Sequence, residues 1–442
     1  MVFDHGPWVV MPDGRGHNFY VSETNTSNKL TVRIFYAASF VNSLASGVTG
    51  PLMVIYLLFV RLTPAQIGIL LAAGRLAMII FEFPTGVFAD RYGKRKSLLI
   101  SFALSSALFL GWFASSSFFQ FFILSILSGL AYTFQSGAKE SLMIDVLQLA
   151  DKDNLRNRVF VRTGSWGNAG FVIGGILAAL LSFFALRSIW LAAAVCNVVL
   201  FLLFLLGVRK NAPLGLNTEP LQPYGLWRKE AATSGISCFF TISKDAIWSL
   251  FSSGPLLRLL GVAVFFSFAT AIYGLAYPVY FKQILNLPDY MFGVLGSVSA
   301  IVGIAGMFMG EKICAHRGPL FALRMFVFSL SLSFVALGFF RVVSVTIFVF
   351  VIIEALIHGW YPMYQSFFNK FVASDVRTSI ISLQSVVSLM AIAGGELAAG
   401  VLISAAPPPI VIEYSSLLLL ITLLLLIKMR PQKTEEKGAL LT

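Results

Sequence analysis

The sequence is poor in charged and thiol side chains, and both shortages exclude whole classes of protein. Only 12% of its 442 residues are Asp, Glu, Lys or Arg, about half the share of an ordinary globular domain. Its three cysteines, Cys196, Cys238 and Cys314, offer neither a disulfide framework nor metal-ligand spacing. The chain also lacks a nucleotide-binding loop and a nucleophile with a base at a readable spacing. We therefore expect no metal, no cofactor, no catalytic residue and no enzymatic activity.

What the sequence has in excess is apolar length. Hydrophobic residues make up 57% of the chain and the mean hydropathy is +0.84, so most of the chain must lie in lipid. The apolar runs are too long and continuous for alternating barrel strands, which predicts an all-α integral membrane fold. We expect about twelve membrane helices, centred near residues 47, 77, 106, 132, 173, 198, 270, 300, 330, 356, 391 and 420.

Positive charge is distributed unevenly around these predicted helices. If the N-terminus is cytoplasmic, most of the 32 Lys and Arg residues fall in cytoplasmic segments. Those on the opposite side are Arg61, Arg187, Lys282 and Arg341. Cytoplasmic loops of membrane proteins are enriched in Lys and Arg, so we predict that both termini are cytoplasmic. The net charge of +12 then reflects membrane topology, and we expect no nucleic-acid partner.

The longest polar interruption divides the predicted helices six and six. Within it, residues 236–251 mix aromatic and charged side chains and could form an amphipathic helix on the membrane surface. The predicted organisation is an N-terminal tail at 1–29, a six-helix bundle at 30–208, a central cytoplasmic loop at 209–253, a second six-helix bundle at 254–429 and a C-terminal tail at 430–442.

An internal repeat supports this division. The segment 62–70 recurs at 287–295 with its Leu and Gly-[Ile/Val]-Leu positions kept, an offset of 225 residues. The same offset carries Gly93 onto Gly318. Parallel repeats of this kind imply two halves related by an axis along the membrane normal, with a binding site between them near the midplane.

A short polar turn at residues 86–96 lies between two predicted membrane helices. Its spacing, Gly-x-x-x-Asp-Arg-x-Gly-Lys-Arg, resembles the loop between the second and third helices of the major facilitator superfamily of secondary transporters. The segments Glu82–Arg91, with its Glu-x-Pro-Thr-Gly-x-x-Ala-Asp-Arg ending, and Ser136–Asp145 resemble a bacterial subgroup of that superfamily. Two positions depart from its drug antiporters, because Phe171 replaces a proline and Ser125 an arginine.

The resemblance implies that the polar turn is a cytoplasmic gate. In the family, the acid, here Asp90, meets a helix N-terminus and basic groups when the protein faces outward, which the helix dipole favours. The alternative is that the turn only orients the chain in the membrane. The second copy has Ala315 and His316 where the first has Asp90 and Arg91, so one gate is intact. The predicted gate residues are Gly86, Asp90, Arg91, Gly93, Lys94 and Arg95.

Ionisable side chains inside the spans are the candidates for substrate binding or proton coupling. Each costs roughly 2.5 to 3.5 kcal/mol at a helix centre unless it is paired or hydrated. Glu354 and His358 are one turn apart and could relay a proton, because histidine changes charge near neutral pH. The alternatives are an interhelical salt bridge for Lys139 and Glu140, a satisfied polar contact for the Glu354–His358 pair, and a structural partner on the second or eighth helix for Glu396. The candidates are Arg75, Glu82, Lys139, Glu140, Glu354, His358 and Glu396.

Four uncharged polar or aromatic residues are candidates for lining the cavity. Asn42 and Gln135 could hydrogen-bond to a substrate, although each is also an ordinary interhelical contact. Tyr273 and Tyr277 lie on one face of a predicted helix, where they could line the cavity; lipid-facing or interfacial packing is the alternative.

The residues and the resemblance together predict a multi-pass transporter of the bacterial inner membrane that works by alternating access. We expect a monomer in the lipid bilayer that exports a small amphipathic or drug-like molecule, with protons as the coupling ion. One alternative is an uptake permease for a polar or anionic metabolite, bound by Arg75 and Lys139. A remote alternative is a membrane receptor or enzyme that does not transport.

Overall fold

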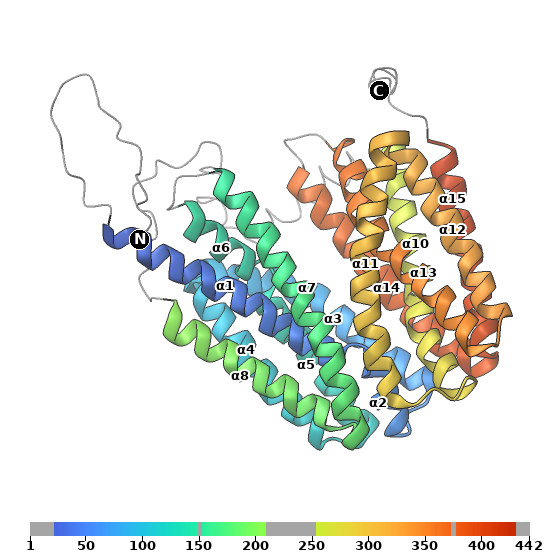
Figure 1. Cartoon of the computed structure of the whole chain (residues 1–442), viewed down its shortest axis with the longest axis horizontal. Helices are drawn as coiled ribbons and strands as arrows, with labels where there is room; N and C mark the ends of the chain where they lie inside the picture. The colour runs from blue at the N-terminus through green and yellow to red at the C-terminus, as the bar shows by residue number, and fades with distance from the viewer. Residues whose placement is uncertain (1–21, 149–152, 209–252, 373–376, 430–442) are drawn as a thin grey trace, which may run out of the picture.

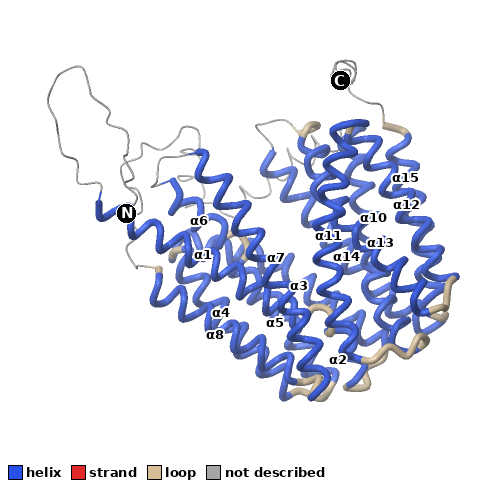
Figure 2. Tube along the Cα trace, viewed as in Figure 1, coloured by secondary structure: helices blue, strands red, loops and turns tan. Residues whose placement is uncertain are grey.

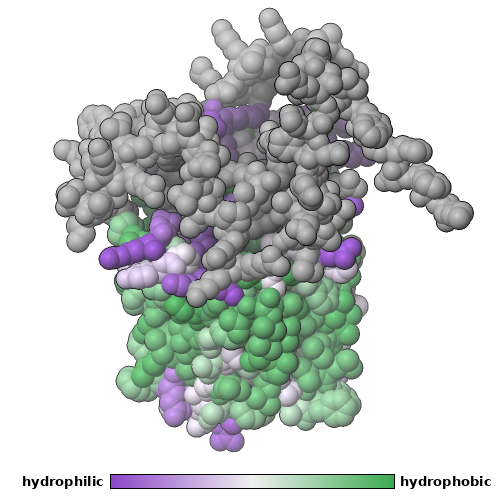
Figure 3. Space-filling view, turned by 90° about the vertical axis from the view of Figure 1, so that its left-hand side faces the viewer, coloured by the Kyte–Doolittle hydropathy of each residue, from purple (hydrophilic) through white to green (hydrophobic). Residues whose placement is uncertain are grey.

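The computed structural model describes residues 22–148, 153–208, 253–372 and 377–429, and every regular element in these ranges is an α-helix (Figures 1 and 2). Within them, twelve helical segments are long and apolar enough to cross a membrane, which confirms the predicted class and number. Hydrophobic residues form a band around the face shown in Figure 3, between more hydrophilic ends. The predicted amphipathic helix at 236–251 and Cys238 lie outside the described residues.

The helices fall into two sets, one on each side of residues 209–252. The first set is α1 (Ser22–Thr49), α2 (Met53–Phe59), α3 (Pro64–Tyr92), α4 (Lys94–Ala114), α5 (Phe118–Gln135), α6 (Ala138–Gln148), α7 (Asp153–Phe184) and α8 (Ser188–Gly207). The second set is α10 (Gly254–Gln283), α11 (Asp289–Arg317), α12 (Pro319–Phe339), α13 (Val343–Asn369), α14 (Arg377–Ala405) and α15 (Pro408–Ile427). Because α1 begins at Ser22, regular structure starts before the predicted tail boundary at residue 29.

Two of the membrane spans are each built from two helices. The first combines α1 and α2, and the fourth combines α5 and α6, which carries Lys139 and Glu140. The single membrane helix predicted around residue 132 is therefore two helices, which is a correction. Ser136 and Gly137 interrupt it, and Gly137 has a φ of 65°, a conformation that glycine adopts without steric cost.

The repeat extends to the helix boundaries themselves. Helices α11, α12 and α13 begin 225 residues after α3, α4 and α5, at Asp289, Pro319 and Val343 against Pro64, Lys94 and Phe118. Gly93 and Gly318, which end α3 and α11, both have positive φ values, 100° and 81°. A side chain there would strain the turn. The two halves therefore share one architecture, with their turns specified in the same way.

The two halves meet at one end and lean apart at the other. In Figure 1 they approach near α2, at the lower end, and separate towards the upper end, where α3 and α11 finish. We call these the closed end and the open end. Between the halves, α3 packs against α14 and α7 packs against α11.

At the closed end, glycines bring the backbones of the two halves into direct contact. A Cβ on Gly68 would overlap the backbone of α14 at Glu396 and Gly400, and one on Gly400 would overlap Pro64 and Ala65 of α3. Helices without a hydrophobic driving force in lipid gain attraction from such close approach.

The second contact between the halves uses glycine in the same way. A Cβ on Gly175 of α7 would overlap Ser297 and the carbonyl oxygen of Gly293 on α11, and one on Gly293 would overlap Gly175 and Ala179. The 225-residue offset maps Gly68 onto Gly293 and Gly175 onto Gly400, so the repeat interchanges the two contacts. We call them the paired glycine crossings.

A glycine at a crossing should tolerate a methyl group far less well than a glycine elsewhere on the same helix. We expect Gly175→Ala to lower the thermal unfolding temperature of the detergent-purified protein. The added methyl group overpacks the crossing, which should reduce the free energy of unfolding by about 1 to 3 kcal/mol. Gly164→Ala, also on α7, should leave it unchanged or slightly higher, because a Cβ there meets nothing within 4 Å. Equal unfolding temperatures for the two variants would show that the crossing is not tightly packed.

Candidate functional site

An ion pair joins the two halves beside one glycine crossing. The Nε of Arg75 on α3 lies 3.3 Å from Oε1 of Glu396 on α14. The Glu396 side chain is 8% exposed and that of Arg75 is 40% exposed. The other carboxylate oxygen of Glu396, Oε2, is buried without a hydrogen-bond partner among the described residues. Arg75 and Glu396 therefore meet each other across the interface.

This ion pair breaks the symmetry of the two crossings. The repeat places Ala300 where Arg75 stands and Phe171 where Glu396 stands, so the α7–α11 crossing has no corresponding ion pair. There a neutral contact replaces it, because the Ser297 hydroxyl donates to the carbonyl oxygen of Val172 at 2.8 Å. The two crossings thus differ, because one holds an ion pair and the other a neutral hydrogen bond.

A second buried carboxylate lies within the C-terminal half. Glu354 on α13 accepts a hydrogen bond from the hydroxyl of Tyr273 on α10 at 3.1 Å, and one from the hydroxyl of Ser299 on α11 at 2.5 Å. The Nδ1 of His358 lies 3.8 Å from its carboxylate and 2.9 Å from its backbone oxygen. Glu354 is 9% exposed, whereas the His358 side chain is 44% exposed. The structure therefore brings Glu354 and His358 together, with the histidine on the accessible side.

The N-terminal half has no room for such a cluster. The offset places Gly129 opposite Glu354 and Gly74 opposite Ser299. A Cβ on Gly129 would overlap the carbonyl oxygen of Gly74, so α3 and α5 are in backbone contact where α11 and α13 hold a carboxylate and a hydroxyl. The buried acid is a feature of one half only.

The predicted gate residues divide into two groups. Lys94 pairs with Asp145 of α6 at 2.7 Å, and Arg95 donates to the carbonyl oxygens of Phe204 and Leu205 at the end of α8, at 3.1 and 2.8 Å. Both basic side chains therefore bind partners within the N-terminal half. Arg95 satisfies carbonyl oxygens at the end of α8, where a cation is favoured.

The remaining gate residues lie free of such contacts at the open end. Asp90 and Arg91 are exposed, and Asp90 makes no hydrogen bond or ion pair with any described residue. Around Gly86 and Gly93 a Cβ would meet nothing within 4 Å. The acid of the gate is thus unengaged in this conformation.

The capping role of Arg95 has a counterpart in the second half. Arg324 on α12 donates to the carbonyl oxygens of Leu426 and Met429 at the end of α15, at 3.0 and 2.8 Å. The offset places Leu320 opposite Arg95, so Arg324 supplies this cap from one turn further along α12, outside the repeated motif.

The other predicted residues lie in the N-terminal half. Glu82 accepts a hydrogen bond from Ser136, at the break between α5 and α6. On α6, Lys139 is half-buried and Glu140 is exposed. Gln135 donates to Asn42 at 2.8 Å, and both line a small polar cavity of about 150 Å³.

The two predicted cavity tyrosines lie inside the C-terminal half. Tyr273 stacks on Tyr277 at 5.0 Å between ring centroids and on Phe334 at the same distance. Neither tyrosine lines the small polar cavity or the larger cavity between the two halves. Instead, the Tyr273 hydroxyl donates a hydrogen bond to the buried carboxylate of Glu354.

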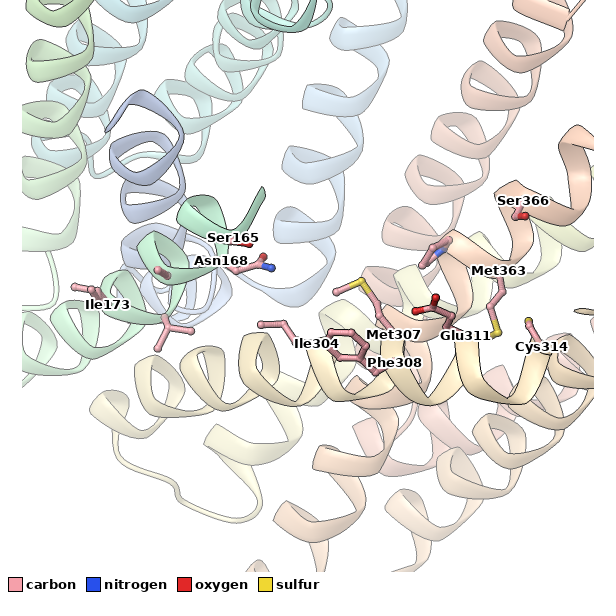
Figure 4. Close-up of a pocket in the computed structure, with 13 residues that line it drawn as sticks. Ser165, Asn168, Ile173, Ile304, Met307, Phe308, Glu311, Cys314, Met363 and Ser366 are labelled. Carbon is pink, nitrogen blue, oxygen red and sulfur yellow. The ribbon is translucent and has the colours of Figure 1, made fainter. Parts of the chain in front are cut away.

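A larger cavity of about 930 Å³ lies between the two halves (Figure 4). One face of α7 lines it from the N-terminal half, and faces of α11 and α13 line it from the other half. We call this cavity the cleft. Sequence reasoning missed its two most polar residues, Asn168 and Glu311. Glu311 is next to Lys312 near the end of α11, where charged residues are common in membrane helices. Only its position on the same helix face as the other lining residues of α11 could have identified it.

Comparison with known proteins gives a consistent family. The sequence profile of the Major Facilitator Superfamily matches residues 35–396. The uncharacterized MFS-type transporter YxaM of Bacillus subtilis is 26% identical over 84% of this chain and 87% of its own length. The class B tetracycline resistance protein of Escherichia coli is 27% identical over 34% of this chain and 37% of its own. The crystal structure of the nucleoside transporter NupG shares the fold, with a TM-score of 0.71 and 14% identity, over 90% of this chain and 99% of that one.

Removing one member of the Arg75–Glu396 pair should cost more stability than removing both. Arg75→Gln leaves the buried Glu396 carboxylate without its counter-ion, which we expect to cost about 1 to 2 kcal/mol. This is less than a fully buried pair because Arg75 is partly exposed. Adding Glu396→Gln should recover much of that loss.

Thermal unfolding of the four proteins in the double-mutant cycle measures this effect. Lys282→Gln is the control, because it breaks the Lys282–Asp289 pair within one half. If the two substitutions at the interface are simply additive, the side chains are not coupled.

Proposed function

The chain belongs to the Major Facilitator Superfamily, a family of membrane transporters, and from that premise we propose that it exports a small amphipathic molecule in exchange for protons. The observation that carries the proposal is the cleft, which lies between two halves that are joined at the glycine crossings and part at the other end. Rocking of two such halves about a central site is the physical basis of alternating access.

We infer that the open end faces the cytoplasm. It carries Lys94, Arg95 and Arg317, while the closed end carries Arg61 and Lys282 among its few basic residues. The excess of positive charge in the sequence lies on the side of the open end, and cytoplasmic loops attract such an excess. On this assignment the conformation is inward-open and can accept cargo from the cytoplasm.

We assign proton coupling to Glu354. A buried carboxylate held by two hydroxyls can exchange a proton without a large change in its surroundings, and His358 offers a second titratable group between it and the accessible space. Intramembrane acids of transporters commonly act in this way. The absence of an equivalent acid in the N-terminal half supports a role beyond packing.

We assign the gate to Asp90. It stands at the end of α3, the helix that crosses α14 at the closed end. When the open end closes, Asp90 would approach the start of α14, where unpaired N–H groups and the helix dipole favour a carboxylate. Its lack of a partner among the described residues is what an open gate requires.

The alternative, uptake of an anionic metabolite, receives less support from the side chains. Arg75 is neutralised by Glu396, and Lys139 does not line the cleft. No basic residue is among the described residues that line the cleft, while Glu311 adds a negative charge. The short likeness to a tetracycline resistance protein also favours export of a drug-like molecule.

Replacing the acid of the proposed proton site should separate coupling from cargo movement. In vesicles that contain the purified protein, we expect Glu354→Gln to reduce dye movement driven by a pH gradient at least about tenfold. Exchange of dye without a gradient should stay near the wild-type rate. The probes are fluorescent amphipathic dyes of positive, zero and negative charge.

Two controls frame this experiment. Glu413→Gln removes an acid from α15 that belongs to neither the Glu354 cluster nor the lining of the cleft, and should leave gradient-driven transport unchanged. If wild-type protein moves dyes equally well after an ionophore collapses the pH gradient, proton coupling is wrong.

A further inference from the structure

We propose that the cleft selects amphipathic cations, with Glu311 as the counter-ion for the positive charge. This inference rests on the proposed export function, because it names the chemical class of cargo that the same cleft would carry. It is based on the side chains that line the cleft and on the distance between Glu311 and the apolar residues among them.

The lining is mostly apolar and comes from continuous helix faces. The lining positions on α7 are residues 165, 168, 169, 172 and 173, and those on α11 are 304, 307, 308, 311 and 314. Spacings of three and four keep each set on one face. The apolar members include Val172, Ile173, Ile304, Met307, Phe308 and Met363. A surface of this kind binds the apolar body of a ligand.

Two side-chain types in the lining suit a bulky and variable cation. Met307 and Met363 are flexible and polarizable, and methionine adapts to irregular ligand shapes. Phe308 presents an aromatic ring, on which a cation can rest through attraction to the ring electrons. Figure 4 shows Met307, Phe308, Glu311 and Met363 close together on the side of the cleft formed by the C-terminal half.

Glu311 provides the charge in this lining. It is exposed to the cleft and makes no hydrogen bond or ion pair with any described residue. The lining residues include no Lys, Arg or His. Lys312 is the next residue on α11, about 100° around the helix, so its side chain leaves in a different direction. The charge of Glu311 is therefore available to a ligand.

The position of Glu311 suits a molecule with a charge at one end. It lies nearer the open end of α11 than Ile304, and seven residues of helix separate them by about 10 Å. A volume of about 930 Å³ is within the usual range for drug-sized ligands. A cation can thus place its charge beside Glu311 and its apolar body against Ile304 and Val172, whereas an anion would be repelled by the carboxylate.

Equilibrium binding of two ions of nearly identical shape and opposite charge tests this inference. The probes are tetraphenylphosphonium and tetraphenylborate, and binding is measured on the detergent-purified full chain without any gradient. We expect the cation to bind the wild type and the anion to compete poorly. Glu311→Gln should weaken cation binding at least about tenfold, and Glu311→Asp should retain binding within about threefold.

A matched control separates the role of Glu311 from a general effect of charge. Glu413→Gln also removes one negative charge, but from α15 and outside the lining of the cleft, so cation binding should not change. Unfolding temperatures of all variants show whether each is folded. If Glu311→Gln is unstable, Glu311→Asp and competition by the anion still decide the question.

The results distinguish this inference from the proposed function. Cation binding that is unchanged in folded Glu311→Gln, or equal competition by tetraphenylborate, overturns the inference even if a pH gradient drives export of neutral dyes. Binding that depends on Glu311 supports it. If vesicles then fail to move the bound cation in response to a pH gradient, the export proposal fails alone.

Discussion

Direct backbone contact at the paired glycine crossings is the constraint on which the rest of this structure depends. Gly68 meets Gly400 and Gly175 meets Gly293, so the halves touch closely at one end without large side chains between them. Close contact at one end leaves the other end able to part, which creates the cleft. Because the repeat interchanges the two crossings, both halves contribute equivalent contacts to the interface, and we propose that they rock about these contacts.

The two halves share one backbone architecture but differ in their charged side chains. Among the described residues, an ion pair joins the α3–α14 crossing but not the α7–α11 crossing. Glu354 of the C-terminal half aligns with Gly129, and Asp90 of the predicted gate aligns with Ala315. Glycine stands in the N-terminal half at the two positions that match Glu354 and Ser299. The first half thus carries the proposed gate and the second the proposed proton site, so coupling between them would have to cross the shared interface.

Local sequence patterns were sufficient for the frame and insufficient for the contacts. Hydropathy along the chain predicted the twelve spans, and short segments that recur 225 residues apart predicted the two related halves. Neither pattern requires knowledge of which helices touch. They did not predict that Arg75 pairs with Glu396, 321 residues away, since that depends on where two helices cross. The break at Gly137 was missed because hydropathy continues through it. Glu311 was missed because its importance lies in the face it shares.

Distances between spin labels on α7 and α11 would show whether the two halves rock about the glycine crossings. In a cysteine-free background, one label pair at Val161 and Arg317 reports the open end, and a second at Phe184 and Tyr290 reports the closed end; all four positions are exposed. Rocking about the crossings predicts that an added transported ligand shortens the first distance in part of the population and lengthens the second in the same part. If both distances stay unchanged, or both shorten together, the halves do not rock about the glycine crossings.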